Sequence, residues 1–148
     1  MRLYLDICAI QRPLDDQSQL RIRLETEAVL GILSACIAGR VELVASSMHV
    51  LETRRNPHRN RRDFAIEVLT LAPEVVTVSD AVVLRAANFV RAGIANADAL
   101  HLAAAVEANA DYFCTTDDKL LKKGQTSDTN GTLVVTPLEL VSKLEREL

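Results

Sequence analysis

Short runs of apolar residues recur along the chain, and longer stretches in which apolar positions have a helical period separate them. A short apolar run bounded by turn residues is typical of a buried β-strand. The pattern therefore predicts five strands, over Arg2–Asp6, Val41–Ser46, Val75–Val78, Tyr112–Thr116 and Thr132–Val135.

The intervening stretches have the spacing and the end signals of helices. The clearest helix runs from about Ser18 to Ala38, and Gly39 is its expected C-cap. Its apolar face is expected to contain Leu20, Leu24, Ala28, Leu30, Leu33 and Ile37. Further helices are predicted from the cap Ser47 to Asn56-Pro57, over Arg61–Leu71, from Ser79 or Asp80 through Val90, from the cap Asn96 over Ala97–Ala108, over Asp117–Lys123, and from the capping box at Thr136 to about Arg146.

Strands that alternate with helices in this way indicate βαβ crossovers and hence a parallel sheet. We predict an α/β fold of three layers, α/β/α, in which helices cover both faces of a central parallel β-sheet. The length of 148 residues suits a single domain over residues 1–148. In such folds ligands bind outside the carboxyl ends of the strands, so functional residues are expected at that edge.

The predicted elements place four acidic residues at that edge. Asp6 ends the first strand and Asp117 directly follows the fourth. Asp98 lies in the first turn of its helix, and Glu52 lies on the helix that follows the second strand. Hard divalent cations prefer oxygen ligands, and Mg²⁺ typically takes one or two carboxylates together with waters and a substrate phosphate. Such an ion can activate water and stabilise the leaving oxygen of a phosphodiester.

Each of these acids also has a structural interpretation, and an isolated aspartate after a strand, such as Asp6, is often a helix cap or a turn residue. Asp98 can simply complement the helix dipole, and Glu52 can be a solvated helix residue that pairs with a neighbouring arginine. Asp117 can cap the helix that follows it, in which case the adjacent Asp118 is the metal ligand. The pattern alone predicts acids gathered at one edge and leaves their individual roles open.

Several segments resemble motifs of PIN domains, the fold of VapC-type toxin ribonucleases. Residues 4–6, which read Tyr-Leu-Asp, resemble the opening of these domains, and residues 46–52 resemble the segment that carries their second acid. More specific are residues 96–105 followed by residues 110–120, which resemble the helix of the third acid and then a strand with a Thr-x-Asp ending. The resemblance extends from Leu3 to about Pro137.

This resemblance implies a hydrolase, namely an endoribonuclease that cleaves RNA with Mg²⁺ or Mn²⁺. The metal ligands that it implies are Asp6, Glu52, Asp98 and Asp117, with Thr115 as a hydrogen-bonding support. It also implies a homodimer and, in the toxin branch, inhibition by a small antitoxin protein. The stretch Arg12–Ser18 lies outside the general pattern, and it leaves open whether the protein is a toxin or a relative with another task.

Basic residues gather after the second acid, at Arg54, Arg55, His58, Arg59, Arg61 and Arg62. Arginine suits bidentate contacts with phosphate, so this segment can steer RNA toward Glu52. Arg54, Arg55 and Arg59, together with Thr115, are the candidates for substrate binding. The alternative, equally favoured, is a solvated loop whose charges balance acids elsewhere.

Other polar residues receive structural interpretations. Charged residues near the start of the long helix, at Asp15, Asp16, Arg21, Arg23, Glu25 and Glu27, are interpreted as a turn and a solvated helix face. His49 and His101 each lie one turn from a candidate acid, and we interpret both as packed helix histidines. Cys8 and Cys114 are expected to behave as small buried apolar residues.

Composition narrows the function classes further. Hydrophobic residues make up 49% and charged residues 25% of the chain, as in an ordinary globular protein, and the net charge of −3 argues against a general nucleic-acid coat. Five aromatic residues are too few for a platform that stacks single-stranded bases. Three scattered cysteines disfavour a zinc or disulfide framework and indicate a reducing cytoplasm. The sequence has neither a signal-peptide pattern nor an apolar run of membrane-spanning length, so no membrane partner is expected.

The sequence has two alternative interpretations beside the ribonuclease. One is a catalytically silent PIN-like binding module that engages a protein partner. The other is a different phosphate-handling α/β enzyme, which the sequence disfavours. A dehalogenase-type phosphatase needs Asp-x-Asp after the first strand, where this chain has Asp6-Ile7-Cys8, and a phosphate-binding P-loop needs a glycine-rich turn that is absent here. A receiver-type phosphoacceptor would need a pair of acids after the first strand and a central aspartate that ends another strand, and neither is evident in this sequence.

Overall fold

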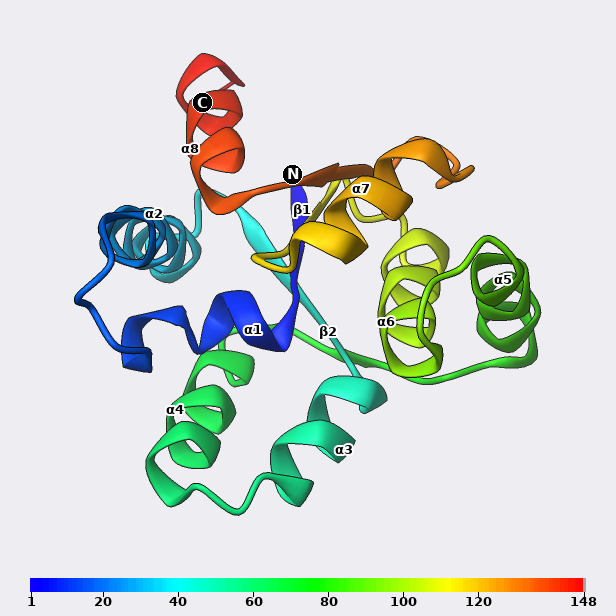
Figure 1. The fold of residues 1–148 in the computed structure, drawn as a ribbon, viewed down its shortest axis with the longest axis horizontal. Coiled ribbons are helices and arrows are strands. Elements are labelled where there is room, and N and C mark those ends of the chain that lie inside the picture. The colour runs from blue at the N-terminus through cyan, green and yellow to red at the C-terminus, as the bar shows by residue number, and fades with distance from the viewer. Residues whose placement is uncertain (148) are drawn as a thin grey trace.

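The computed structural model describes residues 1–147, which form a five-stranded parallel sheet surrounded by helices (Figure 1). The strands are β1 (Arg2–Leu5), β2 (Glu42–Ser46), β3 (Val75–Val76), β4 (Tyr112–Cys114) and β5 (Leu133–Val135). Their order across the sheet is β3-β2-β1-β4-β5, so β1 lies at the centre. In register, Leu3 of β1 lies between Leu43 of β2 and Tyr112 of β4.

Helices connect all five strands. They are α1 (Ile7–Ile10), α2 (Leu20–Ile37), α3 (Ser47–Arg55), α4 (Arg59–Leu69), α5 (Asp80–Arg91), α6 (Asn96–Glu107), α7 (Asp118–Thr126) and α8 (Pro137–Glu147), with a 3₁₀ helix η1 over Arg12–Leu14. Within residues 1–147, none of these helices combines the length and the apolar character needed to cross a membrane.

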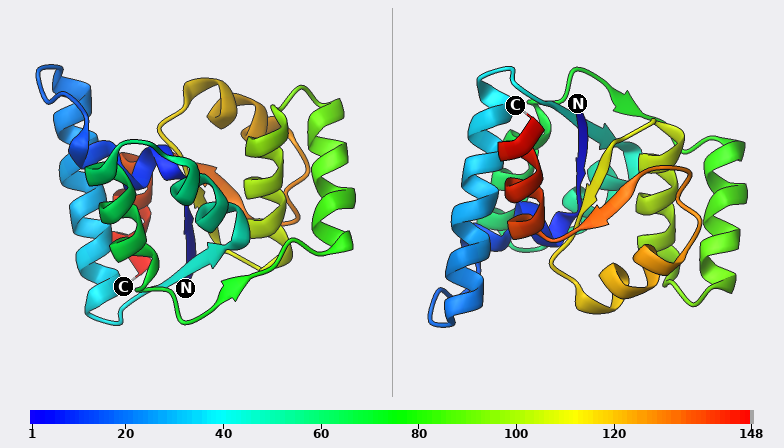
Figure 2. Two further views of the ribbon diagram at one scale, coloured as in Figure 1. Left: turned by 90° about the horizontal axis from the view of Figure 1, so that it is seen from below. Right: turned by 90° about the horizontal axis from the view of Figure 1, so that it is seen from above.

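Side-chain alternation along the strands divides the core into two layers. Leu3 and Leu5 face a cluster that contains buried residues of α2, α4 and α8. Tyr4 points to the opposite face, into a cluster built largely from α5 and the alanine-rich α6. The sheet is therefore covered on both sides, and Figure 2 shows these helices on its two faces. The predicted three-layer α/β/α fold with a central parallel sheet is confirmed.

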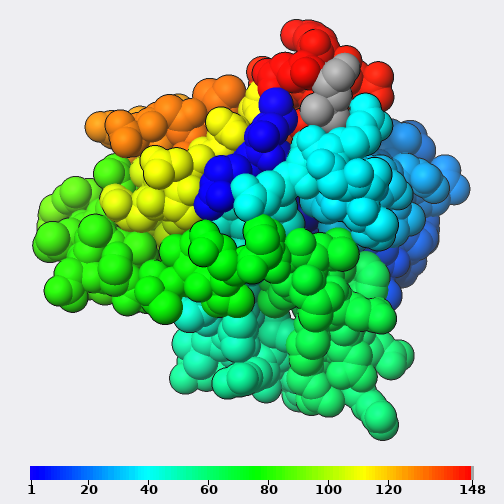
Figure 3. Space-filling view, turned by 180° about the vertical axis from the view of Figure 1, so that it is seen from behind, coloured from blue at the N-terminus to red at the C-terminus, as the bar shows by residue number. Residues whose placement is uncertain are grey.

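The carboxyl ends of β1, β2 and β4 meet at one edge of the sheet, because these strands are parallel neighbours. The turn into α1 and the beginnings of α3, α6 and α7 surround the end of β1 there (Figure 1). On the opposite side of the molecule, the amino-terminal residues lie between the segments that lead into β2 and β4 (Figure 3). The edge at which β1, β2 and β4 end is called the carboxyl edge below.

Most predicted elements are present, with corrections at their ends. Ser46 rather than Ser47 caps α3, through a capping box in which His49 is the third helical residue. Ala95 rather than Asn96 precedes α6, and α4 begins at Arg59 instead of at residue 61. The one-turn helices α1 and η1 were not predicted, because so few residues show no period.

The predicted apolar face of α2 was largely wrong. Leu20 is 62% exposed and Ile37 is 71% exposed, whereas Glu25 is only 2% exposed. The buried face consists of Glu25, Ala28, Val29, Ile32 and Leu33. Two arginines make this burial possible: Arg12 Nη2 lies 2.7 Å from Glu25 Oε1, and Arg21 Nε lies 3.4 Å from it. Glu25 therefore belongs to an internal ion-pair network, and its interpretation as part of a solvated face was also wrong.

Candidate metal centre

The four predicted carboxylates come from four different elements at the carboxyl edge. Asp6 follows β1 and caps α1, while Glu52 lies in the second turn of α3. Asp98 lies in the first turn of α6, and Asp117 caps α7 directly after β4 and two threonines. The parallel sheet thus gathers residues that are up to 111 positions apart in the sequence, the difference between positions 6 and 117.

Asp6 is held by a dense set of hydrogen bonds. Its backbone N–H donates to the carbonyl of Cys114 at 2.8 Å, which fixes it beside β4. Its Oδ1 accepts from the N–H of Ile7 at 2.9 Å. Its Oδ2 accepts from the Thr115 hydroxyl at 2.9 Å and from the Cys8 thiol at 3.1 Å. This carboxylate therefore has a fixed orientation at the end of the central strand.

Cys8 was interpreted as a small apolar residue, and the structure gives it a polar contact instead. Burial, together with the nearby Asp6, raises the pKa of the Cys8 thiol to about 12. The thiol therefore stays protonated and donates to Asp6. Cys114, by contrast, is a fully buried core residue, as expected.

Asp117 and Asp118 are the two alternatives for the fourth metal ligand, and they have different hydrogen-bond partners. Oδ1 of Asp117 accepts from the N–H groups of Lys119 and Leu120, at 2.9 and 3.1 Å, and caps α7. The Asp117 backbone N–H donates to the Thr115 hydroxyl at 3.1 Å, so this one hydroxyl contacts both Asp6 and Asp117. Asp118 instead accepts two hydrogen bonds from Arg21, at 2.7 and 2.8 Å. Asp117 thus adjoins the carboxylate cluster even though it also serves as a cap.

Glu52 faces the buried imidazole of His101 rather than a neighbouring arginine. His101 Nε2 lies 3.0 Å from Glu52 Oε1, although the ring N–H is not aimed along a hydrogen bond. On its other side, His101 Nδ1 is hydrogen-bonded to the Tyr4 hydroxyl at 2.5 Å, and that hydroxyl is also bonded to Ser46 Oγ at 2.7 Å. A polar chain therefore runs from the core to Glu52, and His101 is more than a packed histidine.

His49 has a purely structural role. Its Nδ1 accepts from the backbone N–H of Ser46 at 3.1 Å, so its Nε2 carries the hydrogen and donates to the Leu5 carbonyl at 2.7 Å. Burial lowers its pKa to about 3, which keeps the ring neutral. His49 thereby ties α3 to the end of β1, as the interpretation of a packed histidine predicted.

Electrostatics shows that the acids act on one another. Burial, and next the charges of Asp6 and Asp117, raise the pKa of Asp98 to about 6. Burial also raises the pKa of Asp6, against the lowering effects of His101 and of the hydrogen bonds from Cys8 and Thr115. Glu52 raises both values further. Carboxylates that disfavour one another's ionisation in this way form a region of uncompensated negative charge.

The donor set fits a hard divalent cation. All four candidate ligands supply carboxylate oxygens, which Mg²⁺ and Mn²⁺ prefer. Within residues 1–147, no three acid, imidazole or thiol side chains lie close enough together to hold one ion as they stand. Mg²⁺ usually takes only one or two carboxylates directly and keeps several waters, so a site for it does not require three protein ligands in direct contact.

The predicted arginine segment lies on α3 and α4. Arg54 and Arg55 end α3 and are exposed, and Arg59 is exposed at the start of α4 with its Nε 3.7 Å from Asp63. Arg61 is already engaged, because its Nη2 lies 2.6 Å from Asp15. Arg54, Arg55 and Arg59 therefore stay candidates for phosphate contacts, whereas Arg61 is part of the internal ion-pair network.

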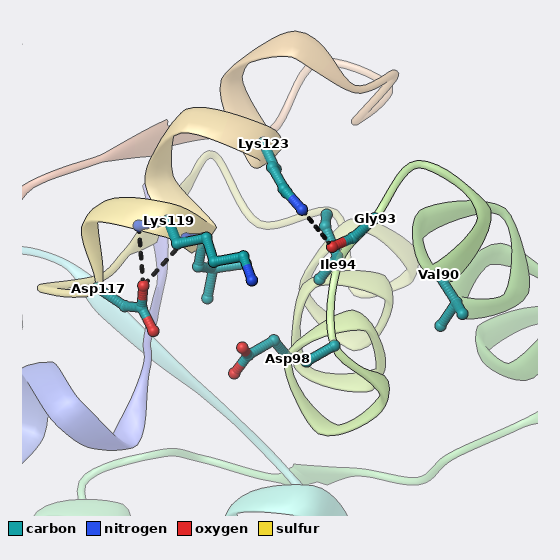
Figure 4. A pocket seen from close by; sticks show the side chains of 9 residues that line it. Val90, Gly93, Ile94, Asp98, Asp117, Lys119 and Lys123 are labelled. Carbon is teal, nitrogen blue, oxygen red and sulfur yellow. Dashed lines mark hydrogen bonds between the residues drawn. The ribbon is translucent and has the colours of Figure 1, made fainter.

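A cavity of about 270 Å³ adjoins the carboxylates, and it was not predicted (Figure 4). It lies between α7 and the turn that joins α5 to α6, and it is lined by Val90, Gly93, Ile94, Ala95, Asp98, Asp117, Lys119, Leu120 and Lys123. The two lysines follow Asp117 on one face of α7, at the i+2 and i+6 positions. Their spacing is visible in the sequence, but their proximity to the α5–α6 turn depends on tertiary packing.

Comparison with known proteins gives a family match and similar folds. The family model described as PIN domain matches residues 7–125. One similar fold is a chain in the crystal structure of VapBC2 from Rickettsia felis, which is bound to a DNA fragment from the VapBC2 promoter. Its sequence is 12% identical to this chain, and the TM-score is 0.62. The match covers 92% of this chain and 98% of that chain. A chain in the structure of FitAB bound to the IR36 DNA fragment is 20% identical with a TM-score of 0.59, over 91% of this chain and 94% of that chain. No curated protein matches the sequence.

Proposed function

This chain belongs to the PIN domain family, and from that premise we propose that it is a divalent-metal-dependent endoribonuclease that hydrolyses RNA phosphodiester bonds. PIN domains are in general nucleases. The observation that carries the proposal is that four carboxylates from four elements lie at the carboxyl edge, where α/β folds bind their ligands, and that burial and the neighbouring acids raise the pKa of Asp98. The proposed metal ligands are Asp6, Glu52, Asp98 and Asp117.

Other residues of the chain orient the proposed metal ligands. The Thr115 hydroxyl orients Asp6 by donating to it, and it fixes Asp117 by accepting from its backbone. The buried His101 ring packs against Glu52 from the core side, with Nε2 3.0 Å from Oε1. Asp98 reaches the cluster from the first turn of α6. When bound, Mg²⁺ or Mn²⁺ supplies positive charge that activates water and stabilises the developing charge on the phosphate.

We further propose that the protein is the toxin of a toxin–antitoxin pair, with a small antitoxin protein as its partner and a homodimer as its assembly. The similarity of the fold to chains in the VapBC2 and FitAB complexes supports this assignment. Growth arrest on expression in a bacterial host is expected for a toxin, and Asp98→Asn should relieve it. A parent protein that cleaves RNA without affecting growth would instead indicate a nuclease with another task.

The experiment that tests the enzymatic proposal is cleavage of a mixed RNA pool by purified protein. Cleavage is expected with Mg²⁺ or Mn²⁺, and excess chelator should abolish it. Asp6→Asn and Asp98→Asn should each abolish cleavage as well. Cleavage that persists in chelator, or in both variants, excludes the proposed centre. Binding of RNA or of a protein partner without any cleavage would favour the silent binding module.

A further inference from the structure

The cavity beside the carboxylates combines apolar walls with charged groups. Val90, Ile94 and Leu120 supply apolar surface, while Asp98 and Asp117 lie on the side of the metal centre. Lys119 extends from α7 toward the space between these two carboxylates, whereas Lys123 reaches to Gly93 (Figure 4). A ligand of this cavity therefore needs an apolar part, and it needs an anionic part that lies near both the lysines and the metal centre.

The two lysines play different parts. Lys123 Nζ donates to the Gly93 carbonyl at 2.6 Å, which ties α7 to the α5–α6 turn. Gly93 has a positive φ of 100°, and a Cβ at this position would lie 2.7 Å from Lys123 Nζ, so the glycine permits this close approach. Lys123 is thus a structural tie that sets the width of the cavity.

Lys119 has no such tie. Its backbone N–H donates to Asp117, while its side chain points into the hollow between Asp117 and Asp98 (Figure 4). Within residues 1–147, its ammonium takes part in no ion pair, although two carboxylates line the same cavity. Its ammonium is therefore available to an anion in this cavity.

The volume decides how much of a nucleic acid fits. Ligand pockets commonly measure about 300–1,000 Å³, so a cavity of about 270 Å³ suits one small unit rather than a run of bases. A single nucleotide has the required combination of an apolar base and ribose face with an anionic phosphate. Double-stranded nucleic acid does not present an isolated nucleotide, so the cavity favours a single strand.

Resting on the proposed function, we propose that this cavity holds the nucleotide next to the scissile phosphate of single-stranded RNA, and that the Lys119 ammonium binds a phosphate of that nucleotide. The strand then passes from the cavity across the four carboxylates. Lys119 is in this account a substrate-positioning residue, and the apolar walls select for an unstacked base.

Equilibrium binding of labelled random-sequence single-stranded RNA in excess chelator tests the lysine, because no cleavage occurs there. Lys119→Ala should weaken binding and make the dependence of log affinity on log salt shallower by about 0.7, the value for one phosphate contact on a single strand. Lys122→Ala is the matched control, because Lys122 is exposed on the same helix and outside the cavity. Lys119→Arg should keep the parental slope.

A second pair of variants tests the cavity without changing charge. Ala95 lines the cavity and makes no side-chain capping bond, so Ala95→Leu fills space without removing a cap. It should weaken RNA binding while the salt dependence stays parental. Ala97→Leu, at an exposed position outside the cavity, should bind like the parent.

These outcomes separate the inference from the function on which it rests. If the parent cleaves RNA with Mg²⁺ but Lys119→Ala binds like Lys122→Ala, or Ala95→Leu binds like the parent, the nuclease stands and this assignment of the cavity is wrong. If the parent neither binds nor cleaves RNA, both proposals are wrong.

Discussion

The imidazole Nε2 of His101 lies 3.0 Å from Oε1 of Glu52, where α6 packs beside α3. The contact joins a fully buried ring to a partly exposed carboxylate. Behind the ring, Tyr4 completes the chain from the core through its bonds to His101 and Ser46. The orientation of Glu52 thus depends on Tyr4 of β1 and His101 of α6, which are both more than 45 positions away in sequence.

Removal of the Tyr4 hydroxyl should destabilise the fold. Tyr4→Phe keeps the ring but leaves the buried Nδ1 of His101 and the Ser46 hydroxyl without this partner, which typically costs about 1–3 kcal/mol. The measurement is the free energy of unfolding in urea. Tyr112→Phe is the control, because its hydroxyl donates to Glu147 near the surface and its loss should cost less than about 1 kcal/mol. An equal loss of unfolding free energy in the two variants would show that the hydrogen bonds of Tyr4 stabilise the fold no more than the surface bond of Tyr112.

The raised pKa of Asp98 makes the stability of the metal-free protein depend on pH. The folded-state pKa of about 6 lies above the ordinary value of 3.8, so folding favours the protonated form. This stabilisation is complete below about pH 3.8 and is lost as the pH rises through about 6. Asp98→Asn cannot ionise, so in chelator its unfolding free energy relative to the parent should rise across that window. A difference that stays constant with pH would mean that the Asp98 carboxyl is not perturbed.

The buried carboxylate of Glu25 should depend on Arg12. Arg12→Met leaves Glu25 with Arg21 as its remaining close cation, and removal of one partner of a buried ion pair typically costs about 3–5 kcal/mol. Urea unfolding should therefore show a loss near the lower end of that range. Arg23→Met, at an exposed position of α2, should change stability by less than about 0.5 kcal/mol. A similarly small loss in Arg12→Met would contradict the ion-pair network.

Asp117 and Asp118 can be distinguished by their effect on metal binding. Asp117→Asn keeps a good capping residue for α7 but removes a candidate ligand, so Mn²⁺ affinity should fall while stability changes little. Asp118→Asn weakens the contact with Arg21 and should leave Mn²⁺ affinity unchanged. Calorimetric titration of both variants decides between them. The reverse pattern would make Asp118 the ligand and Asp117 only a cap.

The sequence predicted the fold well because the strands are short, apolar and separated by long helices. Leu3 and Leu5 lie on one face of the sheet and Tyr4 on the other, but a central strand is buried on both sides and shows no alternation. Asp6 and Asp117 were noticed because each directly follows a predicted strand, Asp98 because it lies in the first turn of a helix, and Glu52 because it lies on the helix that follows the second strand. Parallel topology brings such positions to one edge.

The parts that the sequence did not predict depend on tertiary contacts. Glu25 is buried because Arg12 reaches it from η1, and an isolated helix pattern carries no sign of that pairing. The contact of Glu52 with His101 depends on how α3 and α6 pack. Lys119 is a candidate for substrate binding because α7 packs beside the α5–α6 turn, and the sequence does not show that packing. Hydrophobic periodicity and helix-capping rules describe single elements, so they cannot predict contacts between elements that are distant in sequence.

Calorimetric titration of Mn²⁺ into the metal-free parent, Asp98→Asn and Asp80→Asn tests the metal centre most directly. Asp80 lies in the first turn of α5 as Asp98 lies in that of α6, so both variants remove a carboxylate from a helix N-terminus. The parent and Asp80→Asn should bind Mn²⁺ alike. Asp98→Asn should bind at least about tenfold more weakly, since even residues that only support metal ligands typically contribute 10–100-fold. Equal binding by all three proteins, or no binding by the parent, would contradict a metal centre at the carboxyl edge.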